Sequence, residues 1–207
     1  YEDVIRPSTS LEFVRLDSSV QSLEWNRFFS NILPDCSKLI HLDLHDNLPC
    51  TIDISAFASD ELRDALGNLK ELYLSNTNVY GDVIALANLP KLQTIDLGGT
   101  QVSGEVSAFA HLAAAQHILV QSCKLLIGDV EVLKILSPSL KILDVDGCDG
   151  LSGNLSRLKR DLRSCTIYYT GIYMHWWKEA AANEAALDAA LAPKSRFGSR
   201  YAAKQSY

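Results

Sequence analysis

One segment of this chain recurs, in the same residue order, 23 residues further along. The two copies read Leu69-x-x-Leu72-x-Leu74-x-x-Thr77-x-Val79-x-Gly81-Asp82-Val83 and Leu92-x-x-Ile95-x-Leu97-x-x-Thr100-x-Val102-x-Gly104-Glu105-Val106. A fixed period of this size is typical of stacked supersecondary units, each of which buries its apolar face only against its neighbours. The period therefore constrains the fold more than any other feature of the sequence.

Weaker copies extend the repeat in both directions, so that seven units cover residues 11–172. Their central strand positions are predicted at Val14, Leu42, Leu72, Ile95, Ile118, Leu143 and Cys165. The L-x-L alternation at period two predicts short strands with one side inward, and seven such strands predict a parallel sheet. A small side chain follows each strand, where it can bond unpaired backbone groups: Ser19, Asn47, Thr77, Thr100, Cys123, Cys148 and Thr170.

The second part of each unit is predicted to turn and return to the core. Tight turns on the convex side are expected at Gly81, Gly104, Gly128 and Gly153, each followed by an apolar residue. Segments such as 85–89 are too short for full helices, so we expect single turns or 3₁₀ pieces there.

The pattern L-x-x-L-x-L-x-x-(N/C/T)-x-L resembles the leucine-rich repeat family, and its T-x-V-x-G-D-V form resembles repeats common in unicellular algae and other protists. The resemblance implies an α/β leucine-rich repeat solenoid, curved, with seven parallel strands on its concave face, and a surface for binding without naming the partner. The expected organisation is a solenoid over 1–172, a C-terminal capping or docking helix over 173–192 and a basic extended tail over 193–207.

The charge balance and the cysteine count narrow the class of protein. A net charge of −6 disfavours nucleic acid as a partner, since phosphates demand a basic footprint. The sequence holds no apolar run of about 18 residues that could span a membrane. Five cysteines argue against a disulfide framework and favour a reducing interior compartment, so no disulfide is expected between Cys123 and Cys148. Because the chain opens at Tyr1 and not at Met, we expect a processed product.

The predicted concave face is acidic with aromatic interruptions. Its central positions are Arg15, Asp43, Tyr73, Asp96, Leu119, Asp144 and Thr166, and the positions two residues later are Asp17, His45, Ser75, Gly98, Gln121, Asp146 and Tyr168. The partner-binding candidates among them are Asp43, His45, Tyr73, Asp96, Asp144, Asp146 and Tyr168. Gly98 and Gly99 predict a gap in the middle of the face where partner backbone could approach closely.

The C-terminal segments offer further candidates. Trp176, Ala180, Leu187 and Leu191 follow helical spacing, which suits either a cap over the open end of the solenoid or a docking surface that uses Trp176 and Trp177. The tail holds Arg196, Phe197, Arg200 and Tyr201, whose spacing suits anchoring on a partner. A solvated basic terminus is the alternative reading of the tail.

Catalytic and metal chemistry find little support in the sequence. His41, Asp43 and His45 alternate along one strand, but a strand spreads such side chains about 6.7 Å apart, too far for all three to meet one zinc ion. They are interpreted as ordinary polar residues of the face. The sequence contains no phosphate-binding loop, nucleophile elbow or paired CxxC motif, so no enzyme, metal or cofactor is predicted.

The leading hypothesis is a non-catalytic interaction subunit or scaffold of a larger assembly. Its partners would be other protein subunits, as in an organellar photosynthetic (chloroplast thylakoid) or respiratory (mitochondrial) membrane complex on which it lies peripherally. The alternative is a free-standing recognition module, such as a substrate receptor, that binds a basic segment on the acidic concave face. Both place the protein in an intracellular, reducing compartment.

Overall fold

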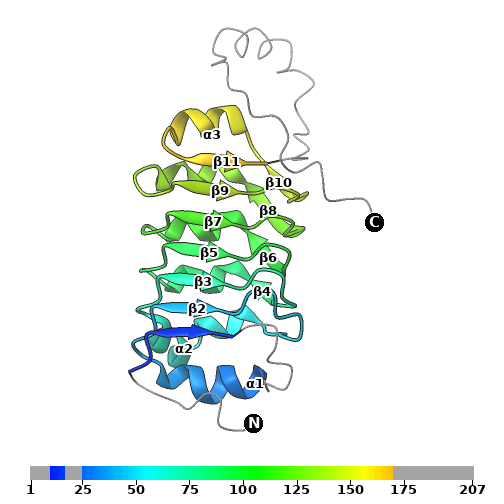
Figure 1. Ribbon diagram of the computed structural model, residues 1–207. Helices are drawn as coiled ribbons and strands as arrows, with labels where there is room; N and C mark the ends of the chain where they lie inside the picture. Colours follow the sequence, from blue (N-terminus) through cyan, green and yellow to red (C-terminus); the bar gives the residue numbers. More distant parts are fainter. Residues whose placement is uncertain (1–9, 17–24, 170–207) are drawn as a thin grey trace, which may run out of the picture. The chain divides into compact units, whose positions relative to one another are not determined.

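A seven-stranded parallel sheet runs through the computed structural model of this chain, which describes residues 10–16 and 25–169. The strands follow chain order from one end to the other (Figure 1). They are β1 (Phe13–Arg15), β2 (His41–Asp43), β3 (Glu71–Tyr73), β5 (Thr94–Asp96), β7 (His117–Leu119), β9 (Ile142–Asp144) and β11 (Thr166–Tyr168). Each neighbouring pair is parallel, which confirms the predicted α/β leucine-rich repeat solenoid.

The inward side chains of these strands form a continuous apolar core. Leu42, Leu72, Ile95, Ile118 and Leu143 pair in register along the stack and are fully buried. Because strand side chains alternate, their neighbours in sequence point to the opposite side of the sheet. We call that outer side the strand face; it is the surface that the sequence analysis calls concave.

A second, four-stranded parallel sheet lies on another side of the stack, where the sequence predicted only turns. Its strands are β4 (Tyr80–Asp82), β6 (Gln101–Glu105), β8 (Leu125–Asp129) and β10 (Leu151–Ser152). An isolated bridge between Asp53 and Tyr80 extends the pairing toward the N-terminus. The convex turns of neighbouring repeats therefore also bond to one another.

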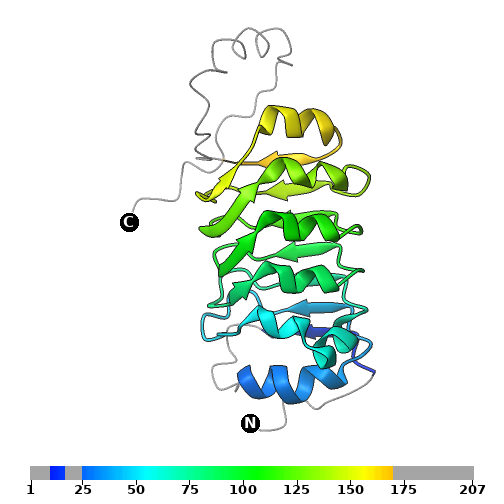
Figure 2. The same ribbon diagram turned by 180° about the vertical axis from the view of Figure 1, so that it is seen from behind.

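Short helices cover the side opposite the seven-stranded sheet (Figure 2). They are α1 (Trp25–Arg27), which runs on into the π-helix η1 (Phe28–Ile32) and the 3₁₀ helix η2 (Leu33–Asp35), then α2 (Asp60–Leu66), α3 (Leu155–Asp161) and the 3₁₀ helices η3 (Ile54–Ala58), η4 (Val83–Asn88), η5 (Val106–His111) and η6 (Val130–Leu136). The predicted 3₁₀ segment at 85–89 is confirmed within η4. Phe28, Phe57 and Phe109 fill the space between this layer and the sheets.

Each convex glycine accommodates a carboxylate from the preceding repeat. Gly81 and Gly104 both have φ of 108°, and a Cβ atom on either would overlap Oδ1 of Asp53 or Asp82 respectively. Those same oxygens accept hydrogen bonds from Ser55 N and Ile84 N and so cap the next short helix. The recurring Gly-Asp pair thus links adjacent repeats as well as turning the chain.

The polar ladder after the strands is confirmed at its five described positions. Asn47 Nδ2 donates to Leu16 O at 2.6 Å and Leu44 O at 3.0 Å, which joins two repeats. The other members donate in the same way to carbonyls of their own or the preceding repeat: Thr77, Thr100, Cys123 and Cys148. These bonds satisfy backbone oxygens that the curving chain leaves without a partner.

The last repeat has a different register from the predicted one. Ile167, and not Cys165, pairs with Leu143, and Cys165 is only partly buried, so Cys165 does not hold the central strand position predicted for it. A shift of two residues preserves the inward and outward alternation of a strand, so the pattern alone could not separate these alternatives. Tyr168 therefore takes the outward position beside Asp144 that was predicted for Thr166.

Two compact units divide the chain, Tyr1–Tyr173 and Met174–Tyr207. All described residues belong to the first unit. The predicted helix at 173–192, the tail at 193–207, and the ladder positions Ser19 and Thr170 lie outside the described residues.

Candidate partner-binding face

Three rows of outward side chains cross the strand face from repeat to repeat. The first row holds Phe13, His41, Glu71, Thr94, His117, Ile142 and Thr166, and the second holds Arg15, Asp43, Tyr73, Asp96, Leu119, Asp144 and Tyr168. The third row, just beyond the strands, holds His45, Ser75, Gly98, Gln121 and Asp146. Strand register therefore brings most of the predicted candidates onto one surface.

The N-terminal part of this face is internally paired. Arg15 Nε lies 3.4 Å from Asp43 Oδ2, and Asp43 Oδ1 bonds the Nδ1 atom of His45. On the same strand as Asp43, His41 Nδ1 lies 2.6 Å from Oε2 of Glu71 on the next strand. Because Asp43 already pairs with Arg15 and His45, these side chains are less open to a partner than the sequence suggested.

Aromatic rings cover the same end of the face. Phe13 stacks on His41 with ring centroids 4.0 Å apart, and His41 packs against Tyr73 at 5.3 Å. Burial, together with the charge of Glu71 and a hydrogen bond to it, raises the pKa of Tyr73. Phe13 and Glu71 were missed in the sequence, although the register of the first three repeats would have placed them beside His41.

In the C-terminal part of the face, Asp96 and Asp144 have no basic partner, neither Lys nor Arg, among the described residues. Asp96 accepts hydrogen bonds from Ser75 Oγ (2.8 Å) and Gly98 N (3.1 Å), and Asp144 accepts one from Asp146 N (3.1 Å). Burial, and then the charges of Asp146 and Asp96, raise the pKa of Asp144. Negative charge therefore accumulates here without being neutralised by a side chain of the described region.

The expected gap at Gly98 is filled. A Cβ atom on Gly98 would overlap the amide of Gln121, which lies over this glycine, and the glycine itself is buried. Gln121 Oε1 is buried and has no hydrogen-bond partner in the structure. The middle of the strand face thus presents a glutamine amide and not bare backbone, which corrects the prediction of close backbone approach there.

Tyr168 closes the row at the last strand. It pairs in register with Asp144, and 51% of its surface is exposed. An exposed tyrosine beside a carboxylate offers both an apolar ring and a polar hydroxyl to a partner. The two tyrosines of the second row, Tyr73 and Tyr168, therefore flank the acidic stretch.

No group of three or more His, Cys, Asp or Glu side chains suited to a metal ion occurs in residues 10–16 and 25–169. Of the predicted trio, His41 bonds Glu71, and His45 bonds Asp43. The five cysteines are free thiols, and burial raises the pKa of Cys50 and Cys148 to about 12. Such thiols stay protonated at neutral pH and are poor nucleophiles.

The remaining candidates lie outside the described residues, namely Trp176, Trp177, Arg196, Phe197, Arg200 and Tyr201. Among the helices that the structure does describe, none has the length and apolar character needed to cross a bilayer.

No family model and no curated protein sequence matches this chain. Among solved structures, it is similar to an internalin from Listeria monocytogenes, with a TM-score of 0.46 and 19% identity over 68% of this chain and 45% of that chain. It is also similar to the leucine-rich repeat ectodomain of the receptor kinase SOBIR1 from Arabidopsis thaliana (TM-score 0.46, 24% identity, 59% of this chain and 63% of that one). A third is a plant ice-binding protein (TM-score 0.44, 19% identity, 67% and 58%).

This chain thus spans less than two thirds of each of those chains. The leucine-rich repeat fold is assigned here from the strand register and the repeat spacing.

Proposed function

We propose that this chain is a non-catalytic protein-interaction module whose strand face binds a basic, extended segment of a partner protein. The observation that carries the proposal is the pair of carboxylates on Asp96 and Asp144, which share a row and have no Lys or Arg partner among the described residues. An unneutralised row of this kind attracts cationic segments and repels acidic ones.

The spacing of the carboxylates suits an extended segment that runs along the stack. Asp96 and Asp144 are separated by one intervening strand, hence by about 10 Å at the usual distance between strands. Two cationic residues three positions apart in a segment with the extended polyproline II conformation lie on the same side and have about the same separation, roughly 9 Å. Tyr73 and Tyr168 would contact the flanking residues of such a segment, since aromatic side chains are frequent anchors at interfaces.

The raised pKa of Asp144 supports a binding role. Burial, and then the charges of Asp146 and Asp96, make the ionised form of Asp144 costly in the free protein, and a bound cation would relieve part of that cost.

A more specific version of this proposal is that the chain is a subunit of a larger assembly. A recognition module can serve as a subunit, and the complex proposed for it is an organellar photosynthetic or respiratory membrane complex on which it lies peripherally. Its proposed contacts are Trp176, Trp177 and the residues of the tail, and a tail-deleted chain lacking 193–207 should co-purify less with its assembly while still folding.

The test of the strand face is a selection from a random peptide library displayed on phage, with the full-length chain as bait. Peptides that bind should be enriched in Lys and Arg. The variant Asp96→Asn/Asp144→Asn should weaken binding of a selected peptide by about tenfold or more, because hydrogen bonds and pairs to charged groups are each worth about 1 kcal/mol or more when partly desolvated.

The matched control is Glu61→Gln/Asp64→Asn, which removes the same charge from exposed positions on α2. If the selected peptides show no basic bias, or if both variants weaken binding equally, the strand face is not the binding surface.

A further inference from the structure

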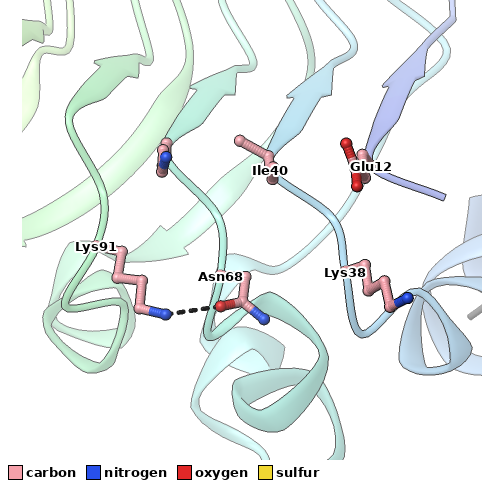
Figure 3. Close-up of a pocket in the computed structure, with 6 residues that line it drawn as sticks. Glu12, Lys38, Ile40, Asn68 and Lys91 are labelled. Carbon is pink, nitrogen blue, oxygen red and sulfur yellow. Dashed lines mark hydrogen bonds between the residues drawn. The ribbon is translucent and has the colours of Figure 1, made fainter. Parts of the chain in front are cut away.

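A basic hollow opens at the edge of the seven-stranded sheet where its strands begin, away from the row of aspartates. Its lining consists of Glu12, Lys38, Ile40, Asn68, Lys70 and Lys91, around a cavity of about 300 Å³ (Figure 3). We call this group the basic edge. None of these residues belongs to a motif that the sequence makes evident.

The repeat itself places the lysines there. Leu39, Leu69 and Leu92 open consecutive units and are fully buried, so the residues on either side of each leucine project outward. Backbone bonds from Lys70 N to Ile40 O and from Gln93 N to Lys70 O keep these edge positions in register from one repeat to the next. The lysines therefore occupy two rows across three adjacent repeats. Lys38 and Lys91 lie in the row of Asn68, two repeats and hence about 10 Å apart, and Lys70 lies in the row of Ile40.

The ammonium groups of the basic edge are not neutralised by acids. Lys38 and Lys70 have no hydrogen-bond or salt-bridge partner among the described residues, and Lys91 Nζ donates at 2.7 Å to the neutral amide oxygen of Asn68. Glu12 is the one acidic residue of the lining. Two repeats further along, Lys141 Nζ likewise bonds an amide oxygen, that of Gln116, at 2.7 Å.

This concentration of positive charge stands out in a chain whose net charge is −6. Amide oxygens hold the ammonium groups of Lys91 and Lys141 in place without cancelling their charge, so this side of the sheet keeps a positive potential.

The arrangement of the lysines fits a chain of anionic groups better than one compact anion. In Figure 3 the Lys91 side chain points toward Asn68, whereas Lys38 points away from it, so these two ammonium groups do not converge on one point. A single phosphate is normally bound by groups that converge on it. Separated cations spread over three repeats instead suit carboxylates at intervals along an extended backbone, whose same-side residues repeat at about 6.7 Å, because long lysine side chains can adjust to that spacing.

We infer that the basic edge binds an acidic, extended peptide segment of a partner protein, with Lys38, Lys70 and Lys91 pairing its carboxylates. The segment runs along the stack and its backbone lies over Ile40. This surface is separate from the acidic strand face, and the inference does not rest on the function proposed for that face. A partner that carries both a basic and an acidic segment could occupy both surfaces.

The experiment is a fluorescence-anisotropy titration of the full-length chain into a fluorescein-labelled peptide. The peptide has about eight residues in which Glu and Ser alternate, which is long enough to span the three repeats of the basic edge. We expect saturable binding that weakens as salt is added. The variant Lys38→Gln/Lys70→Gln/Lys91→Gln should lose about tenfold or more in affinity, since exposed ion pairs are weak one by one but act together here.

The matched control is Lys124→Gln/Lys134→Gln/Lys159→Gln, which removes the same charge at exposed positions elsewhere on the solenoid and should bind the peptide like the unmodified chain. Equal losses in both variants would show that only net charge matters, and would overturn the inference. So would an absence of binding to the acidic peptide.

Two further probes separate the other sources of negative charge. Inorganic phosphate at millimolar concentration should compete no better than chloride at equal ionic strength, and vesicles with phosphatidylserine should not retain the chain in co-sedimentation. Strong competition by phosphate, or vesicle binding lost in the Lys38/Lys70/Lys91 variant, would assign the edge to phosphate groups and refute an acidic peptide as its partner.

Discussion

Replacing Gly104 with alanine tests how adjacent repeats are joined. Gly104 has φ of 108°, a conformation that costs a residue with a Cβ atom about 1–3 kcal/mol. The new Cβ would also overlap Asp82 Oδ1, which accepts the hydrogen bond of Ile84 N at 2.9 Å. Displacing that cap costs about 1 kcal/mol more. The free energy of unfolding should therefore fall by about 2–4 kcal/mol.

The assay is urea unfolding followed by circular dichroism, with three companion variants. Gly67→Ala is the matched control, since Gly67 has φ of −61° and its added methyl would sit 3.3 Å from the nearest atom, so a change within about 0.5 kcal/mol is expected. Gly128→Ala should cost less than Gly104→Ala, because it meets the flexible end of Glu105, which makes no capping bond.

The third companion variant separates the cost of the backbone conformation from the cost of displacing the Asp82 cap. In an Asp82→Ala background the carboxylate is gone, so Gly104→Ala should cost only its backbone conformation, about 1 kcal/mol less than in the unmodified chain. An identical cost in both backgrounds, or a cost below about 0.5 kcal/mol in the unmodified chain, would refute this account of the glycine.

Three further outcomes are expected. Asn47→Ala should lower the free energy of unfolding by about 2–3 kcal/mol in urea titrations, because it leaves the carbonyls of Leu16 and Leu44 without a buried donor. Native labelling with a thiol reagent should leave Cys148 unmodified between pH 7 and 9, since burial raises its pKa to about 12; the stability from keeping this thiol protonated is full below about pH 8.5 and is lost as the pH rises toward 12, so rapid labelling at pH 8 would contradict the structure. Asp144→Asn should stabilise the chain at pH 7 and have less effect at pH 3, because a carboxyl with a raised folded pKa contributes stability only below its unfolded pKa of about 3.9 and loses it as the pH rises; a destabilised variant at pH 7 would count against the charge crowding.

The repeat period allowed the sevenfold parallel sheet to be predicted because each unit repeats the same inward positions, from Val14 to Leu143. The predicted register of the last unit was wrong because Cys165 and Ile167 are two residues apart, and both fit the inward positions of a strand. The second sheet was missed since its strands contain Gly81, Gly104 and Gly128, residues that propensity places in turns.

The sequence predicts which residues lie on the candidate surface, but it does not predict which of their charges are paired. Rows of outward residues follow from register, so Asp96 and Asp144 were placed correctly on one face. That Asp43 is paired with Arg15 and His45 depends on side-chain geometry in three dimensions. The position of the Gln121 amide over Gly98 depends on a rotamer that no sequence pattern encodes.

The fit of Asp82 against Gly104 also makes the solenoid extensible. A second copy of residues 81–103 inserted after residue 103 would set the first Asp82 against the new Gly81, and the second Asp82 against Gly104, so both seams keep the contacts seen now. Each 23-residue block carries both halves of the contact side by side, because Gly81 meets the preceding repeat and Asp82 meets the following one. Gene duplication can therefore lengthen both faces of this protein by whole repeats without inventing a new junction.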